Sequence, residues 1–327
     1  MSDYKEVVGT AIKNVAGDPP APLEGELWYN SSTDSFKIYK TSTFLSWATG
    51  NNMNTARESL TGAGTQTSGL AFGGITNPNT RHVATEYYNG TNWTELNNLN
   101  AARSGLGGCG ASHTAALAFG GFSNPPVTRH VSTETWNGTN WTEVNNLNTG
   151  RNELTGCGTN TAALAFGGYP TPTGKTETWN GTNWTEVNDL GESRNNPGGC
   201  GTNTAALAMG GTDPKTSATE LWNGTNWTEL NDFNTVREMG AAAGISTAAI
   251  GIGGSDPGQS PNLFANTESW NGTNWTEVAD LNTKRGGMGG GGTGTLALAF
   301  GGESPPPVAA TEEWSEGTGL RTETITS

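Results

Sequence analysis

The chain contains 327 residues, of which 49 are glycine and 14% are charged, and its formal net charge at pH 7 is −14. The glycines follow no Gly-X-Y period, which excludes collagen, and the 12 tryptophans indicate a packed core rather than disorder. The acidic balance argues against nucleic acid as a partner, because no excess of lysine and arginine is available to replace counterions. No run of about 18 apolar residues occurs, so we expect no membrane insertion.

The start of the chain does not resemble a signal peptide. It reads MSDYKEVVGTAIKNVAG, with Asp3 and Glu6 where a signal peptide needs basic residues, and no sustained apolar stretch follows. We therefore expect the protein to be made in a cytoplasm. The stretch 22–50, PLEGELWYNSSTDSFKIYKTSTFLSWATG, contains short strand-like runs. We interpret residues 1–43 as an N-terminal β-hairpin or extended segment that precedes a separate body of residues 44–327.

A unit of 43 to 48 residues repeats through that body. Each unit contains a glycine-rich run, an AALAFGG-like run, a TETWN-like run and a WTEV-like run, with turn residues between them. No helical period is present, and short strands at regular spacing are typical of all-β folds. Residues 44–327 are therefore predicted to form a β-propeller of six four-stranded blades. The Gly-Gly pairs that mark the units begin at Gly73, Gly120, Gly167, Gly210, Gly253 and Gly301.

The tract TETWNGTNWTEV at residues 133–144 returns in later units with small changes. Asn-Gly between two strand-like runs predicts a hairpin, because both residues accept positive φ. Tryptophans at the same place in every blade are predicted to fill the space between neighbouring sheets, each burying about 150–250 Å². The Asn-x-Thr sequons of the tract are interpreted as turn chemistry. The structural tryptophans are Trp93, Trp136, Trp141, Trp179, Trp184, Trp222, Trp227, Trp270, Trp275 and Trp314.

Two runs compete for the last strand of blade six. In TEEWSEGTGLRTETI, Trp314 matches Trp136, and Leu320 stands roughly where a tryptophan is expected. The run FLSWATG carries Trp47 one period before Trp93 and can supply that strand instead. A partial seventh blade built from GELWYN and FKIYK is the remaining alternative.

The glycine-rich runs are assigned to the first strand of each blade. First strands converge on the central axis, so they need small side chains. Cys109, Cys157 and Cys200 occupy one equivalent position in three successive runs, with no Cys-x-x-Cys or histidine cluster nearby. We interpret them as small inner-strand residues rather than metal ligands or a disulfide framework, and we predict no metal and no cofactor.

One arginine and one glutamate recur in every unit. The arginine precedes the glycine-rich run, and the glutamate lies in the TETWN-like run. We hypothesise that they form a charged hydrogen bond between blades, a structural role. The arginines are Arg57, Arg103, Arg151, Arg194, Arg237 and Arg285, and the glutamates are Glu86, Glu134, Glu177, Glu220, Glu268 and Glu312.

The connections between second and third strands differ in every unit, whereas the NGTN turn between third and fourth strands is nearly constant. Variable loops on a rigid scaffold are where recognition usually resides. Phe122, Tyr169 and Phe264 are therefore candidates for stacking on a sugar ring, with Arg81 and Arg129 as polar contacts. The alternative is that these are ordinary surface residues.

Several of these features recur together at fixed offsets. Gly-Gly after a β segment, then Thr-Glu-x-Trp, Asn-x-Trp-Thr and Leu-Asn-x-x-Arg, resembles the kelch repeat from about residue 44 to 326. The stretch 22–50 is similar to a segment near the N-terminus of many phage virion proteins. Among these are kelch-like proteins of marine bacteriophages, and the continuation NTARESLTGAGTQTSGLAFGG at 54–74 is similar to theirs.

This resemblance implies a non-enzymatic structural protein of a virion: a tail fibre, a head fibre or a decoration protein. Residues 1–43 are expected to bind other virion proteins, and the propeller to contact a host-surface glycan or protein, with a homo-oligomer as a further expectation. An intracellular kelch-type interaction adaptor is the alternative. A carbohydrate-active propeller enzyme is less favoured, because no acid–base pair, nucleophile or metal set departs from the repeat.

Overall fold

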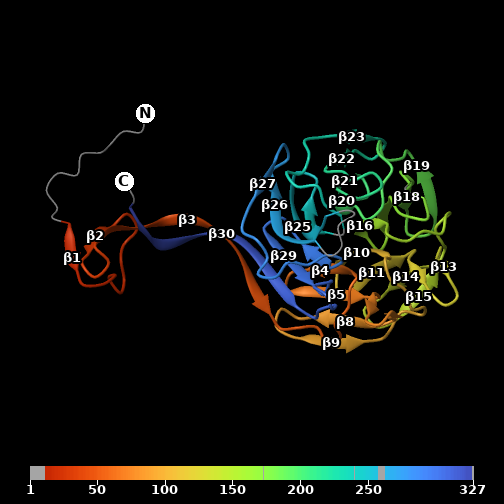
Figure 1. Ribbon diagram of the computed structural model, residues 1–327, viewed down its shortest axis with the longest axis horizontal. Helices are drawn as coiled ribbons and strands as arrows, with labels where there is room; N and C mark the ends of the chain where they lie inside the picture. Colours follow the sequence, from red (N-terminus) through yellow and green to blue (C-terminus); the bar gives the residue numbers. More distant parts are fainter. Residues whose placement is uncertain (1–11, 172, 239, 257–261, 326–327) are drawn as a thin grey trace. The chain divides into compact units, whose positions relative to one another are not determined.

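The computed structural model describes residues 12–171, 173–238, 240–256 and 262–325 (Figure 1). Regular structure in these ranges is β-strand, and no helix there is long and apolar enough to cross a membrane. The chain forms two compact units. The larger is Ser46–Ser315, and the smaller combines Met1–Leu45 with Glu316–Ser327. The larger unit thus begins slightly after the expected boundary at 43/44, and the C-terminal residues belong to the smaller unit rather than to the propeller.

Five four-stranded antiparallel sheets and four strands of a six-stranded sheet form the propeller, and each of these six groups corresponds to one predicted blade. Their first strands contact one another in sequence, and β28 also contacts β4, so the ring is closed. The protein is a six-bladed β-propeller.

Blade one contains β4 (Thr61–Thr65), β5 (Ser68–Phe72), β8 (Thr85–Tyr88) and β9 (Trp93–Leu96). Blade two contains β10 (Gly107–Ser112), β11 (Ala115–Phe119), β14 (Thr133–Trp136) and β15 (Trp141–Val144). Blade three contains β16 (Thr155–Thr159), β17 (Ala162–Phe166), β18 (Thr176–Trp179) and β19 (Trp184–Val187). Blade four contains β20 (Gly198–Thr202), β21 (Ala205–Met209), β22 (Thr219–Trp222) and β23 (Trp227–Glu229). Blade five contains β24 (Ala241–Ile245), β25 (Ala248–Ser255), β26 (Leu263–Trp270) and β27 (Trp275–Glu277).

Blade six is built from both ends of the chain. Its strands are β28 (Gly289–Gly292), β29 (Leu296–Phe300), β30 (Thr311–Thr324) and β3 (Ser35–Gly50). The FLSWATG run therefore completes this blade, and Trp47 packs on Trp314 with ring centroids 5.6 Å apart. The alternative of a seventh blade is wrong. The GELWYN and FKIYK runs instead pair with each other, where β2 (Leu27–Asn30) meets the start of β3 and is joined by β1 (Lys13–Val15).

The tryptophans fill the space between neighbouring blades, as predicted. Trp141 of blade two lies against Phe72 of blade one, with ring centroids 4.9 Å apart, and its Nε1 donates a hydrogen bond of 2.9 Å to Thr85 Oγ1. Because the indole leaves water and its N–H is still satisfied, this contact stabilises the junction. The same indole-to-threonine hydrogen bond occurs at all six junctions: Trp93–Thr311, Trp141–Thr85, Trp184–Thr133, Trp227–Thr176, Trp275–Thr219 and Trp47–Thr267.

Glycine in the first strands makes room for a phenyl ring from the blade before. A Cβ added to Gly156 in β16 would lie 2.2 Å from Cζ of Phe119 in β11, and one added to Gly62 would lie 2.4 Å from Cζ of Phe300. Real Cβ atoms do not come this close to a carbon. Close approach of the blades therefore explains the glycine content that the sequence assigns to these strands.

Each recurring arginine links two blades. The main chain of Arg103 belongs to blade one, where its carbonyl accepts the N–H of Gly74 at 2.9 Å and its own N–H donates to the His82 carbonyl at 3.3 Å. Its side chain reaches blade two, where Nη2 lies 2.7 Å from Glu134 Oε1. Burial lowers the pKa of Arg103 and Glu134 raises it. The hypothesised charged hydrogen bond is present in five blades, and in blade five Arg237 and Glu268 form an ion pair in which Glu268 Oε1 accepts no hydrogen bond. The six ion pairs are Arg57–Glu86, Arg103–Glu134, Arg151–Glu177, Arg194–Glu220, Arg237–Glu268 and Arg285–Glu312.

Candidate functional site

The two faces of the propeller differ in composition. One face carries the NGTN turns, in which Asn137 Oδ1 accepts the N–H groups of Thr139 and Asn140 at 2.9 and 2.8 Å. These hydrogen bonds explain the recurring sequon-like triplets as turn chemistry. The other face carries the variable connections between second and third strands, and we call it the loop face. Side chains that distinguish one blade from the next are concentrated there, so the loop face is the candidate site.

The loop-face connections of blades one and two are small hairpins. In blade one, β6 (Ile75–Thr76) pairs with β7 (Thr80–Arg81), and in blade two, β12 (Phe122–Ser123) pairs with β13 (Thr128–Arg129). This pairing sets Phe122 opposite Arg129 on adjacent arms. The connection of blade three is shorter, and its Tyr169 is held by a bridge to Asn152 at the entry to that blade.

Two histidines close these hairpins. The Nε2 atoms of His82 and His130 lie 3.0 Å from the hydroxyl oxygens of Thr76 and Ser123, respectively. Burial lowers the pKa of both imidazoles, and the neighbouring Arg57 or Arg103 lowers it further. A neutral imidazole is therefore favoured at both positions, where it braces the hairpin rather than carrying charge. The matched positions of these two histidines in the sequence have this structural cause.

Guanidinium and aromatic groups alternate across the loop face of blades one to three. Arg81 Cζ lies 4.8 Å from the centre of the Phe122 ring. Arg129 Cζ lies 5.9 Å from that ring and 4.8 Å from the centre of the Tyr169 ring. We call these four residues the arginine–aromatic row. Four of the five predicted binding residues are thus brought together, but they stack on one another, which the sequence does not reveal.

The fifth predicted residue is not part of this row. Phe264 lies in β26 of blade five, opposite Gly254 of β25, and is half-buried. Blade five extends its second and third strands beyond those of the other blades, through a register shift between Ile252 and Gly254. Phe264 therefore belongs to the sheet rather than to the tip of the loop, although sequence spacing places it in the connection.

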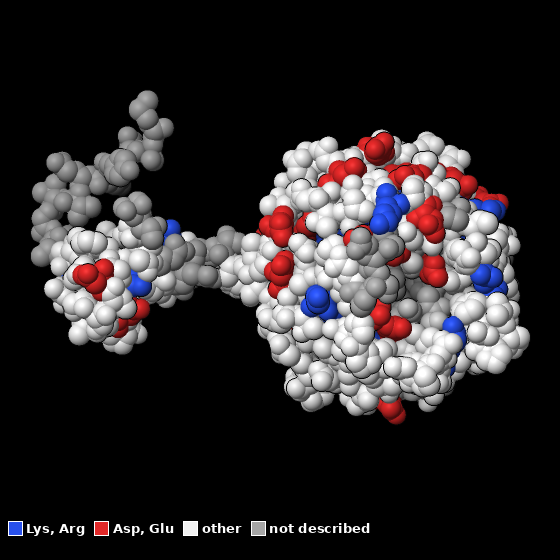
Figure 2. All heavy atoms as spheres, viewed as in Figure 1, with Lys and Arg blue, Asp and Glu red and all other residues white. Residues whose placement is uncertain are grey.

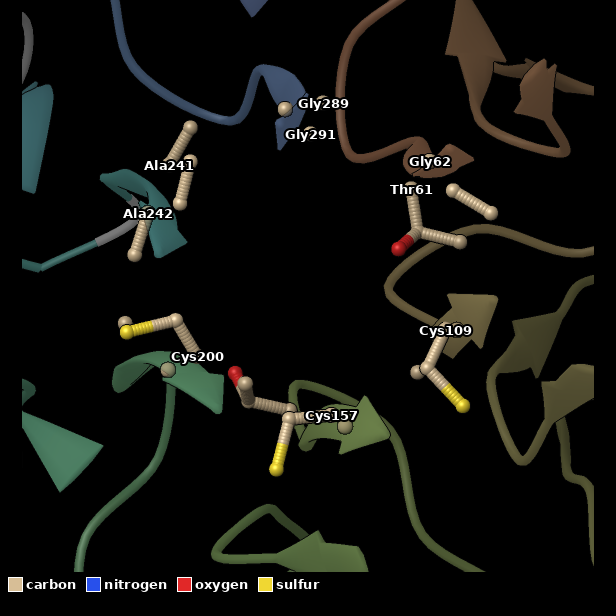
Figure 3. A pocket seen from close by; sticks show the side chains of 18 of the residues that line it. Thr61, Gly62, Cys109, Cys157, Cys200, Ala241, Ala242, Gly289 and Gly291 are labelled. Atoms are coloured by element: carbon tan, nitrogen blue, oxygen red, sulfur yellow. The ribbon is translucent and has the colours of Figure 1, made fainter. Parts of the chain in front are cut away.

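The inner strands surround a channel of about 330 Å³, which is open at its mouth (Figure 3). The sulfur atoms of Cys109, Cys157 and Cys200 point away from the channel axis, and all three are buried free thiols. Burial raises the pKa of Cys109 and Cys200 to about 12. These cysteines are small inner-strand residues, as interpreted from the sequence, and the channel wall is rich in glycine. It is lined by residues 59–64, 105–110, 153–158, 196–201, 240–244 and 287–292.

A ring of main-chain hydrogen bonds at the channel mouth was not foreseen. The N–H of Glu153 donates to the Gly105 carbonyl at 2.7 Å, and the N–H of Asn196 donates to the Glu153 carbonyl at 2.9 Å. The ring positions share a left-handed backbone. The residue types at these positions differ, so residue identity does not predict the left-handed conformation. What the positions share in the sequence is that each lies two residues after a recurring arginine. The described members are Ser59, Gly105, Glu153, Asn196 and Gly287.

Carboxyl groups gather around this mouth, and acidic atoms flank the central hollow in Figure 2. Burial raises the pKa of Glu58, and the nearby Glu303 raises it further. Burial also raises the pKa of Glu238, against a hydrogen bond from Asn196 that lowers it. Within the described ranges, no three His, Cys, Asp or Glu side chains are grouped so that they can hold a metal ion.

No protein-family model and no curated protein matches the chain. Among solved structures, it is similar to YjhT, with a TM-score of 0.66 over 82% of this chain and 99% of the YjhT chain. Together with the six repeated sheets, this similarity decides the fold. The chain has a β-propeller fold. The two sequences are only 13% identical, so the similarity extends to the fold and not to the role of any residue.

Proposed function

We propose that this kelch-type propeller is a non-enzymatic virion protein of a bacteriophage, a tail fibre, head fibre or decoration protein, that recognises a glycan on the host surface. The variation of the loop face between blades is the observation that supports the recognition role. The blades share strands, tryptophans and ion pairs almost unchanged, whereas the loop-face side chains differ between them. Scaffold constancy combined with variable connections is the usual arrangement of a binding surface.

The smaller unit supports the attachment role. It contains residues 22–45 of the stretch that is similar to a segment of phage virion proteins. It also has its own buried anchor in Trp28, whose Nε1 donates to Asp18 Oδ1 at 3.2 Å. It also leaves large apolar side chains exposed, among them Leu23 and Phe36, which are 76% and 47% exposed. Exposed apolar side chains gathered in a small unit favour contact with another protein.

The chemistry of the loop face and channel supports a binding role rather than catalysis. The channel thiols have raised pKa values, so they are weak nucleophiles near neutral pH. Both loop-face histidines are committed to hydroxyl partners within the hairpins. On blades one to three, the loop-face groups that remain open to a ligand include guanidinium donors and aromatic rings, which hold ligands rather than transform them.

Two measurements test the proposal. Mass spectrometry of purified particles from the phage that encodes the chain is expected to detect it as a stoichiometric component. The labelled full-length protein is expected to bind host cells, and periodate oxidation of the cell-surface glycans is expected to abolish that binding. Absence from the particles contradicts the virion role, and binding that survives periodate contradicts the glycan as the ligand.

A further inference from the structure

The two arginines of the arginine–aromatic row differ from the other arginines of the propeller. Six of the eight arginines whose side chains the structure describes are buried and paired with a glutamate. In the described part of the chain, the Arg81 side chain hydrogen-bonds only to Asn79, with Nη1 3.0 Å from Oδ1, and no hydrogen bond or ion pair is found for the Arg129 side chain. Neither guanidinium group therefore has a carboxylate partner within the described residues.

Stacking fixes these guanidinium groups without using their hydrogen-bond donors. The cation–π contacts place Arg81 Cζ and Arg129 Cζ 4.8 Å from the centres of the Phe122 and Tyr169 rings and use no N–H donor. The Nε atoms of both arginines are buried without a hydrogen-bond partner, so the terminal Nη groups are the donors that a ligand can reach. A planar fork held by aromatic rings matches carboxylate, sulfate or phosphate groups and loses little conformational entropy on binding. The β6–β7 and β12–β13 hairpins carry Arg81, Phe122 and Arg129, and the hydrogen bonds of His82 and His130 hold these hairpins in place.

The surrounding charges make this location distinct. The chain has a net charge of −14, and the channel mouth next to the row is acidic. In Figure 2, acidic atoms flank the central hollow, and basic atoms stand farther out on the same face. An anion is therefore attracted to the row and repelled by the mouth, so the field selects one location on the loop face.

We infer that the arginine–aromatic row binds an anionic group, a carboxylate, sulfate or phosphate, on an acidic host-surface glycan. This inference rests on the proposed glycan-recognition function and adds the class of glycan. Arg81 and Arg129 bind the acidic group, and Tyr169, which is 36% exposed, offers its remaining ring surface to the adjoining sugar. A neutral glycan leaves both guanidinium groups without a counter-charge and binds more weakly.

Titration calorimetry with the full-length protein tests the inference. The probes are tetragalacturonate, sulfated maltotetraose and phosphorylated maltotetraose, which separate the three acidic groups, and neutral maltotetraose. We expect at least one acidic probe to bind about tenfold or more tightly than the neutral one, and this preference to shrink as salt screens the charges. Equal affinity for neutral and acidic probes overturns the inference.

Substitutions locate the site. Arg129→Gln is expected to weaken binding of the preferred acidic probe by about tenfold, and the double variant with Arg81→Gln to weaken it further. Lys284→Gln removes the same charge from an exposed position on the connection between blades five and six, and is expected to leave the affinity unchanged. An unchanged affinity of Arg129→Gln, with the thermal unfolding of the wild type, overturns the inference.

The failure of this inference can be separated from failure of the proposed function. If the protein binds host cells in a periodate-sensitive way, and if Arg81→Gln with Arg129→Gln does not weaken that binding, the glycan-recognition function stands and the row is not its site. If the wild-type protein binds no cells and no probe, the proposed recognition function itself fails.

Discussion

The indole Nε1 of Trp47 donates a hydrogen bond to Thr267 Oγ1, 3.1 Å away, and so joins the N-terminal part of the chain to blade five. Every other blade junction makes the same bond, and at the two junctions of blade six the bonded residues come from opposite ends of the sequence: Trp47 with Thr267, and Trp93 with Thr311. The ring is therefore closed because blade six combines β3 from the N-terminal part of the chain with β28, β29 and β30 from the C-terminal part.

Trp47→Ala is expected to lower the free energy of unfolding by about 3–5 kcal/mol, because it removes a buried indole at the closing junction. Guanidinium-induced unfolding followed by tryptophan fluorescence measures the change. Trp184→Ala removes the equivalent indole at the junction of blades two and three and is the matched comparison. A Trp47→Ala protein as stable as the wild type contradicts closure through β3.

Arg151→Ala is expected to destabilise the fold by about 3–5 kcal/mol, because it leaves Glu177 buried without its partner. The guanidinium Nη2 lies 3.1 Å from Glu177 Oε1, and both side chains are about 1% exposed. Arg129→Ala is the control, since it removes an arginine with no carboxylate partner in the described chain, and is expected to cost at most about 1 kcal/mol. Equal melting temperatures for the two variants contradict a structural role of the ion pair.

Gly156→Ala is expected to cost about 1–3 kcal/mol through overpacking against Phe119. The substitution Phe119→Leu removes the atoms that the new methyl group meets, so the two changes together are expected to cost less than the sum of their separate effects. Gly17→Ala adds a methyl group where nothing lies within 4 Å and is the control for the substitution itself. Strict additivity in the double-variant cycle argues against the blade contact as the reason for glycine.

The raised pKa of Glu58 predicts a dependence of stability on pH. Because the folded protein holds this proton more tightly than the unfolded chain, the contribution of Glu58 is full below its ordinary pKa of about 4.3 and is lost as pH rises through the folded value. Glu58→Gln is therefore expected to raise the melting temperature at neutral pH. The difference from the wild type is expected to vanish below about pH 4.

Glu143→Gln removes a carboxylate from an exposed position and serves as the control for Glu58→Gln. It is expected to change the melting temperature little at either pH, because an exposed charge is screened by water and salt. Scanning calorimetry at neutral and acidic pH follows both variants. If Glu58→Gln melts below the wild type at neutral pH, the fold stabilises the Glu58 carboxylate, and the predicted direction of the pH dependence is wrong.

Much of the propeller could be predicted from the sequence, because the same pattern of residues recurs in every blade. The Asn-Gly turns, paired tryptophans and small first strands are local features, and their period fixes how many sheets there are. The arginine–glutamate pairs could also be predicted, since both residues recur once per unit. The continuation of β30 into the smaller unit could not be predicted, because nothing in the repeat marks where that strand leaves the propeller.

The arrangement of the candidate site was harder to predict from the sequence. Arg81, Phe122, Arg129 and Tyr169 could be selected one by one as loop residues, but their stacking depends on how three neighbouring blades are spaced. Phe264 was misplaced because the longer strands of blade five draw it into the sheet. The ring at the channel mouth depends on backbone conformation at residues of unrelated types, such as Glu153 and Gly105, so residue identity carried no signal.

The chain enters and leaves the propeller through adjacent strands of one sheet, because β3 and β30 are hydrogen-bonded neighbours in blade six. Tension applied through the smaller unit therefore loads this blade directly, while the other five lie outside the path of the force. A pulling force on the smaller unit is therefore expected to strain blade six first, whereas the arginine–aromatic row lies on blades one to three.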